Sequence, residues 1–241
     1  MDPSAFLSMG LMGAFFIAIP VLFVVLIVWS VKANKKRRAQ LAAIAASWGW
    51  NYAPRDQSLV TRWTVSPFGN GSSRAANHVL WGPTAGPTGT IRQAITFEYQ
   101  YTISSGSGDN RSSTTYYFHI PVVLLPVSTP VLMLTPEGFG ASLAKFFGGQ
   151  DIQFESEDFN KAWRIQSKDL RFAHDIVHPR MMEFLMEPRN RGRAINLVGD
   201  GVMVVQSGKL MPENVLPMVT RCNEFLELLP AYVLQDRGYR G

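Results

Sequence analysis

The sequence predicts an α+β fold: one N-terminal transmembrane helix, followed by a cytoplasmic domain with a mostly antiparallel sheet and helices packed on one face. Three observations lead to this prediction. No charged residue lies between Asp2 and Lys32. The middle of the chain alternates apolar and polar residues and is rich in β-branched and aromatic side chains, which favours strands. The C-terminal part carries an apolar stripe at helical spacing.

The apolar run of residues 6–31 is long enough to cross a bilayer, because a helix rises about 1.5 Å per residue and the hydrocarbon core is about 30 Å thick. A secretory signal would place positive charge before a shorter apolar run, whereas here the charge follows it. We therefore expect an uncleaved anchor. Gly10, Ala14 and Ala18 recur at every fourth position, which predicts a face where another membrane helix packs.

The basic residues that follow the run predict both orientation and a contact with membrane lipid. Positive residues stay on the cytoplasmic side of a membrane and attract anionic lipids. The predicted organisation is an external N-terminus at 1–5, a span at 6–31, a juxtamembrane segment and helix at 32–48, a soluble domain at 49–235 and a tail at 236–241. The predicted lipid-contacting residues are Lys32, Lys35, Lys36, Arg37 and Arg38.

The basic pI of about 9.5 arises at this junction and not in the domain. The chain has 23 Lys and Arg against 18 Asp and Glu. Setting aside Asp2 and the five basic residues of the junction leaves 18 basic against 17 acidic residues, so the charge expected of a nucleic-acid-binding domain is missing. The single cysteine, Cys222, excludes an intramolecular disulfide and is expected to be a buried thiol.

Residues 90–103 and 114–125 give the clearest strand pair, and the polar, Gly-rich segment 104–113 predicts a long hairpin tip. Pro121 should place the end of the second strand at an edge or a bend. The Gly199-Asp200-Gly201 tripeptide predicts a second hairpin between strands at 195–198 and 202–206. Shorter strands are expected at residues 50–52, 59–65, 78–81, 131–134, 151–155 and 162–166.

Short helices are expected at residues 141–147, 169–177 and 179–187, the last with Pro179 at its first position. The strongest helix lies at the C-terminus, where apolar residues form one stripe. We expect this helix to cover the sheet that carries Trp163, so that both belong to one core. The stripe consists of Val215, Val219, Cys222, Leu226, Leu229 and Val233.

No catalytic, cofactor-binding or metal-binding constellation is evident in the sequence. His174 and His178 have the i, i+4 spacing of a helical metal pair, but Pro179 favours a helix boundary at His178 and no third ligand is apparent. The sequence contains no P-loop and no serine nucleophile elbow. Arg189, Arg191 and Arg193 form a basic loop that could contact an anion, although such loops are more often simply solvated.

The segment FESEDFNKAWRIQSKDLRFAHDIVHPRMMEFL, together with the upstream GWNY, PFGNG and FEYQY motifs, resembles an uncharacterised family of actinobacterial single-pass membrane-anchored proteins. The resemblance covers most of the chain after Gln40. It implies a bacterial source and anchoring in the inner membrane, and it assigns no reaction or ligand. His178 stands where similar sequences carry an apolar residue, so no role is transferred to it.

Two functions remain open from the sequence. The first is a membrane-tethered, non-enzymatic interaction or accessory protein that serves an envelope or transport assembly, with a membrane protein as its partner. The alternative is a membrane-surface enzyme, or a domain that binds a small ligand or a lipid headgroup. Tethering favours the first, because it raises the effective concentration of the domain near membrane partners.

Overall fold

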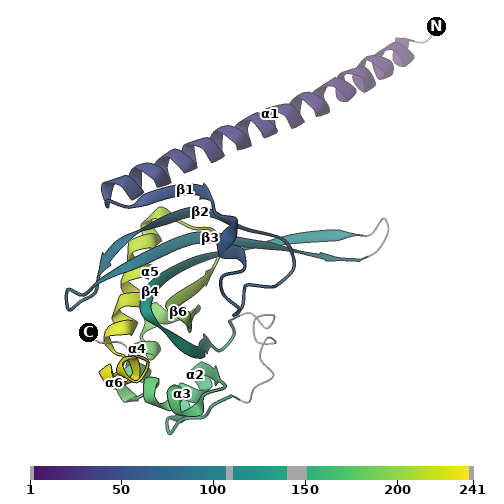
Figure 1. Cartoon of the computed structure of the whole chain (residues 1–241). Helices are drawn as coiled ribbons and strands as arrows, with labels where there is room; N and C mark the ends of the chain where they lie inside the picture. Colours follow the sequence, from purple (N-terminus) through teal and green to yellow (C-terminus); the bar gives the residue numbers. More distant parts are fainter. Residues whose placement is uncertain (1–2, 107–110, 140–150, 239–241) are drawn as a thin grey trace.

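The computed structural model describes residues 3–106, 111–139 and 151–238, with side chains from residue 21 onward. The chain forms an α+β domain from which one long helix, α1 (Pro3–Ser47), extends (Figure 1). Within the described residues the sheet has six strands in the order β1-β2-β3-β4-β5, with β6 pairing the other edge of β4, and every pairing is antiparallel. The α+β class with an antiparallel sheet is therefore confirmed.

The strands are β1 (Asn51–Arg55), β2 (Ser72–Ala85), β3 (Ile91–Ser105), β4 (Ser112–Pro136), β5 (Trp163–Ser167) and β6 (Arg193–Ser207). The α-helices of the domain are α2 (Glu157–Ala162), α3 (Leu170–Ile176), α4 (Pro179–Met186), α5 (Pro212–Glu227) and α6 (Ala231–Gln235). Short 3-10 turns in the described residues are η1 (Gln57–Val60) and η4 (Pro188–Asn190).

Strand β4 organises the sheet, because it pairs β6 along most of its length and pairs β3 and then β5 along its other edge. Its pairing with β6 shifts register between Leu124 and Thr129, and Figure 1 shows that β4 is strongly bent along its length. The bend brings the two ends of β6 together, so that Arg193 Nε donates to Gln206 Oε1 at 2.9 Å across thirteen residues of chain.

The two faces of the bent sheet bury two separate cores. The buried apolar residues of the α-helices after residue 40 all lie in the first core, together with Leu132, Leu134 and Trp163 of the sheet. The second core lies on the other face, where Trp63 and Phe68 of the β1–β2 connection pack on Phe97 and Tyr99. The helices of the domain therefore cover one face, as the sequence predicts.

Strand β6 is not the predicted hairpin. Residues on both sides of Gly199 pair with β4, and Gly199 itself, at φ +57°, lies opposite Thr129 at the register shift. Glycine fits here because it adopts positive φ without strain. The Gly-Asp-Gly signature therefore lies within one long strand, opposite the residues of β4 that break the register, and does not reverse the chain.

Four further expectations change or fall outside the described residues. Residues 59–65 contain the end of η1 and irregular chain in place of a strand, and only Ile152 of residues 151–155 makes a β bridge. Pro121 lies inside β4, opposite Thr96, and not at an edge. The helix expected at residues 141–147 lies outside the described residues.

The expected transmembrane helix is not supported by the structure. Among the residues with described side chains, none belongs to a helix that is both long and apolar enough to cross a membrane. From Val21 onward only eleven residues of α1 precede Lys32, which corresponds to roughly 16 Å against a core of about 30 Å. The predicted packing residues Gly10, Ala14 and Ala18 lie outside the residues whose side chains are described.

Candidate functional site

Helix α1 is fixed to the sheet near β1 and β2. Leu41 and Ala45 of α1 are fully buried in the first core, beside Trp50. The indole of Trp50 donates to Pro83 O at 2.8 Å and lies over Gly82, where a Cβ would come within 2.4 Å of the ring. The glycine therefore makes room for the tryptophan that ends the α1 connection.

A buried ion pair adds a second attachment. Glu98 of β3 is only 3 % exposed, and its Oε2 accepts from Arg37 Nη2 of α1 at 2.6 Å. The same oxygen accepts from Leu210 N at 3.0 Å, while Arg37 also donates to Leu210 O at 2.7 Å. A carboxylate buried in a sheet needs such partners, because an uncompensated charge there is costly. Arg37 thus connects α1, β3 and the chain entering α5.

His78 and Tyr52 lie beside this ion pair. Tyr52 Oη and His78 Nδ1 are 3.0 Å apart, and His78 adopts φ +51° where β2 shifts register against β3. Burial lowers the pKa of His78, and the charge of Arg37 lowers it further, although Glu98 acts in the opposite direction. Burial also raises the pKa of Tyr52. Both groups are therefore neutral at pH 7.

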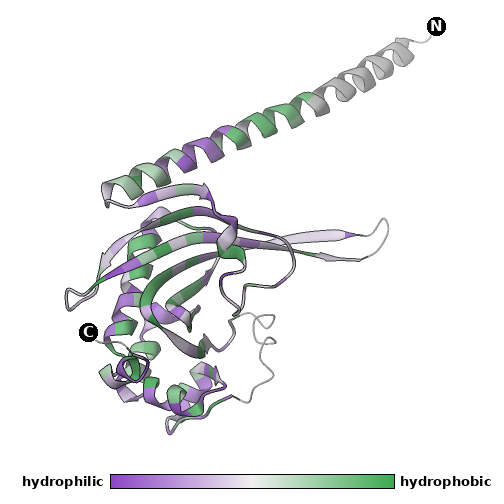
Figure 2. Cartoon of the chain, viewed as in Figure 1, coloured by the Kyte–Doolittle hydropathy of each residue, from purple (hydrophilic) through white to green (hydrophobic). Residues whose placement is uncertain are grey.

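The basic residues predicted to contact lipid divide into two kinds. Arg37 turns toward the domain, whereas the other four are exposed on α1. Figure 2 shows them as a polar band that follows the apolar part of α1. In that apolar part every side chain from Val21 to Val31 is exposed, with Trp29 at 71 %. The exposed four are Lys32, Lys35, Lys36 and Arg38.

A second candidate site is a groove of about 520 Å³ between α4, α5 and the β2–β3 turn. Phe184, Leu228 and Pro87 give it apolar surface, and charged side chains line the rest. Glu227 joins two of the elements, since it accepts from Arg92 Nη1 at 2.9 Å and from Thr88 Oγ1 at 2.8 Å. The charged lining residues are Arg180, Glu183, Glu187, Arg189, Glu224 and Glu227.

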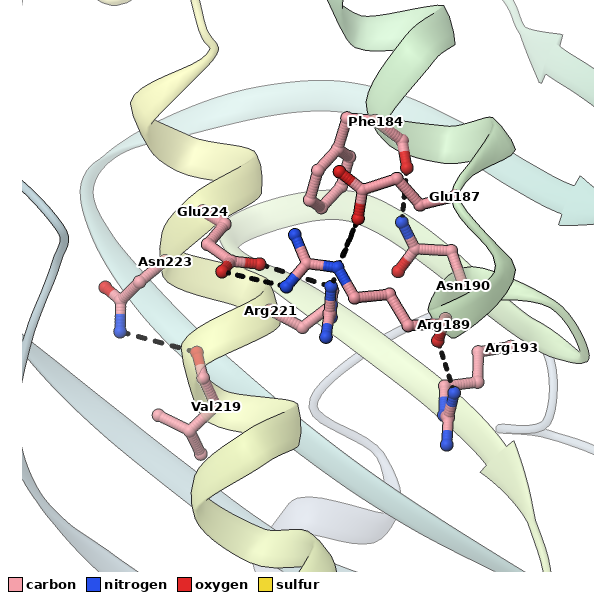
Figure 3. Close-up of polar contacts among 9 residues, drawn as sticks. All are labelled: Phe184, Glu187, Arg189, Asn190, Arg193, Val219, Arg221, Asn223 and Glu224. Carbon is pink, nitrogen blue, oxygen red and sulfur yellow. Dashed lines mark hydrogen bonds and ion pairs between the residues drawn. The ribbon is translucent and has the colours of Figure 1, made fainter.

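Most of these charges are already compensated within the domain (Figure 3). Arg189 contacts both Glu187 and Glu224, and the hydrogen bond that Arg189 donates to Glu187 raises the pKa of Arg189. Arg221 of α5 approaches the same two carboxylates, and burial lowers its pKa. By contrast, Arg180 and Glu183 make no hydrogen bond or ion pair within the described part of the chain.

The three arginines of the predicted basic loop have different surroundings. Arg189 belongs to the ion network, and Arg193 donates to Arg189 O and to Gln206, so both guanidinium groups have partners inside the domain. Arg191 is exposed. Nearby, Asn190 is fully buried and donates to Phe184 O, which holds η4 against α4.

The two histidines of the metal-like pattern do not share a helix face. His178 is the N-cap of α4, where its Nδ1 accepts from Met181 N and its Nε2 faces Leu228 O at 2.9 Å. His174 lies in α3 and contacts the ring of Phe154. His178 therefore lies at a helix boundary, as predicted. In the described ranges, no three His, Cys, Asp or Glu residues gather where they could hold a metal ion.

The role of Glu98 could not be read from the sequence. It falls on the polar side of an alternating strand, with Thr96 and Gln100, and that pattern predicts a solvent-facing residue. The polar side is instead covered by α1 and the start of α5. A carboxylate in such a strand gives no local signal of its partner, because Arg37 lies 61 residues earlier in the chain.

The comparisons with known proteins give one informative match. No family model matches the chain, and no curated protein matches it. A crystal structure of the mycobacterial trehalose monomycolate transport factor A, TtfA, superposes with a TM-score of 0.52 at 16 % sequence identity. The match covers 80 % of this chain and 95 % of that one, so the two chains share a fold over most of their lengths.

Proposed function

We propose that this chain is a non-enzymatic accessory protein of an envelope transport assembly, held at the inner membrane by α1. The observation that supports the proposal best is the fold shared with a transport factor over 95 % of that protein. A long helix attached to the domain by a buried ion pair agrees with a domain held at a set orientation to a membrane. The resemblance to the actinobacterial family agrees with anchoring in the inner membrane, although it assigns no reaction or ligand.

The exposed apolar surface of α1 is the second support. Ten apolar side chains and Ser30 are exposed between Val21 and Val31, and they continue a run without charge that begins after Asp2. Exposed apolar surface of this extent normally has a partner or a membrane to cover it. We propose that the whole run crosses the inner membrane, with the N-terminus outside and the domain in the cytoplasm.

The experiment that tests the accessory role is photo-crosslinking in native membranes. A photoreactive amino acid is placed at Arg180 in the groove, and the matched control places it at Lys161, whose side chain is 72 % exposed on α2. The proposal expects a membrane transport protein to be crosslinked from position 180 and not from position 161. Crosslinks that are the same from both positions would contradict it.

A small-ligand site in the same groove is the second candidate function. The observation in its favour is that Arg180 and Glu183, one turn apart on α4, line a groove of about 520 Å³ without partners in the described residues. Paired groups of opposite charge beside apolar surface are typical of sites for polar ligands. A thermal-shift screen of polar metabolites, with Arg180→Ala as control, tests this candidate, and stabilisation that persists in the variant argues against the groove.

A further inference from the structure

The loop between β6 and α5, residues 208–211, lies beside Arg37 in the basic segment of α1, residues 32–38. Leu210 is fully buried, and its N–H and C=O are bound to Glu98 and Arg37, so the loop is attached to the same ion pair as α1. Gly208 N donates to Tyr117 O at 2.8 Å, which fixes the other end of the loop on β4.

The two neighbours of Leu210 are both exposed. Lys209 is exposed, with its Nζ 4.8 Å from the ring centroid of Tyr117, and Met211 is 46 % exposed. Successive side chains of an extended segment point to opposite sides, and Met211 has extended dihedral angles. Burial of Leu210 therefore turns Lys209 and Met211 together away from the core.

The charge around this loop is mostly positive. Arg37 is paired with Glu98, but the charges of Arg38 and Lys209, from segments far apart in the chain, also act on His78 and have no such partner in that group. Glu213, exposed in the first turn of α5, is the acidic residue nearest in sequence. A cation beside an exposed apolar side chain and a tyrosine ring suits the headgroup region of a bilayer, where aliphatic and aromatic groups insert and Lys reaches the phosphates.

We propose that residues 208–211 form a second membrane contact, in which Lys209 binds the phosphates of anionic lipid headgroups and Met211 enters the headgroup region beside α1. The proposal rests on the proposed anchoring by α1, and it adds a surface of the folded domain to that anchor. Together with Arg37, this contact would hold the domain against the membrane and not merely near it.

The test uses the full chain in lipid nanodiscs with an environment-sensitive fluorophore on a single introduced cysteine. Native Cys222 does not compete for the label, because it is fully buried and burial raises the pKa of its thiol to about 12. The labelled variants are Met211→Cys, Trp29→Cys as a reporter of the α1 anchor, and Lys161→Cys as a site on α2. Nanodiscs contain either zwitterionic lipid alone or a mixture with anionic lipid.

The proposal expects a blue shift at position 211 that is larger with anionic lipid and is lost in high salt, while position 161 does not change. Adding Lys209→Glu to Met211→Cys should weaken the anionic response about fivefold or more, the effect of one lysine near an anionic surface. Lys161→Glu, with the same change in charge, should leave it intact.

The failures of the two proposals are distinguishable. A blue shift at position 29 without one at 211, or a shift at 211 that does not depend on anionic lipid, overturns the loop contact and leaves the anchor in place. No blue shift at position 29 overturns the anchor. A shift at 211 that needs an added protein in place of anionic lipid would assign the loop to a protein partner and also overturn the proposal.

Discussion

At the residue scale, loss of the Arg37–Glu98 pair should destabilise the domain. Arg37→Gln leaves the carboxylate of Glu98 buried with only Leu210 N as a partner. Breaking a buried ion pair costs about 3–5 kcal/mol, and the 24 % exposure of the Arg37 side chain reduces this to about 1–3 kcal/mol. Chemical unfolding in detergent measures the loss, and Lys36→Gln, exposed on the same helix, should change little. Equal stabilities of the two variants would contradict the prediction.

His119 gives a prediction about pH at the same scale. Burial, with a smaller effect of the charge of Arg193, lowers the pKa of His119 to about 3, and its Nε2 lies 2.8 Å from Thr96 Oγ1. An unfolded histidine titrates near pH 6.5. Above pH 6.5 His119 is neutral in both states and does not change the free energy of unfolding. Below pH 6.5 the unfolded state binds a proton that the folded state does not, so the folded state loses stability.

The expected result is a loss of stability of about 1.4 kcal/mol per pH unit below 6.5, or about 2 kcal/mol by pH 5. His119→Gln keeps a polar side chain that does not titrate, so its stability should fall less between pH 7.5 and pH 5. The pKa of His78 is lowered too and leaves a residual slope in the variant. Urea unfolding at the two pH values measures the free energy of unfolding. An equal loss of stability in wild type and variant between these values would contradict the prediction.

At the element scale, α5 closes the first core. The C-terminal helix covers the sheet as predicted, since Leu226 and Trp163 lie in the same core. All six residues of the predicted stripe are buried, but they do not belong to one helix: α5 ends at Glu227, Leu229 follows it and Val233 lies on α6. Leu226→Ala should cost about 2–5 kcal/mol, the usual cost of a large-to-alanine change in a packed core. Leu216→Ala, on the same helix but 39 % exposed, should cost no more than about 0.5 kcal/mol.

Thermal melting of the full chain measures both variants. Trp163→Ala should behave like Leu226→Ala, because both remove contacts from one core. If removal of the chain from Pro212 onward leaves a protein that melts cooperatively near the parent temperature, α5 is an appendage and the stripe is better understood as a docking face. The full chain is the right reference, because a fragment that begins at Gln40 would lack Arg37.

The elements that could be predicted are those whose signal lies in their own sequence. The β3–β4 hairpin follows from alternation, α4 from Pro179 at its first position, and α5 from its apolar stripe. β6 could not be predicted, because a Gly-Asp-Gly sequence suits both a hairpin turn and an irregular point within one strand, and the pairing with β4 decides between them.

Pro121 shows the same limit from the other direction. The lack of an N–H argues against a position inside a sheet. Its carbonyl accepts from Cys222 Sγ of α5 at 3.8 Å, so the strand at this point is covered by a helix and is not at an edge. Arg37 and Glu98 are likewise joined only by the tertiary fold. Local patterns thus predict helices and strands, whereas contacts between distant segments determine how these elements pair and which of their residues are buried.

At the scale of the whole molecule, the Arg37–Glu98 ion pair connects the long helix α1, the sheet and the loop that precedes α5. A helix attached at one point to a domain could pivot, whereas α1 is attached through Arg37 as well as through Leu41 and Ala45. The direction in which α1 leaves the domain is therefore set by the fold (Figure 1). If α1 enters a membrane, the domain has a defined face toward it.

The orientation of the chain in that membrane is the last prediction. The cluster Lys32–Arg38 follows the apolar run, and positive residues stay on the cytoplasmic side. Because Arg37 is held by the domain, the domain and the cluster must lie on the same side. A phosphatase that is active only outside the inner membrane, fused after Gly241, should therefore be inactive, and a cytoplasmic fluorescent reporter at the same position should be bright. Changing the four exposed basic residues to Gln, with Arg37 kept, should produce a mixed orientation. Phosphatase activity from the unmodified chain would overturn the predicted orientation, and recovery of the protein in the soluble fraction would overturn the anchor itself.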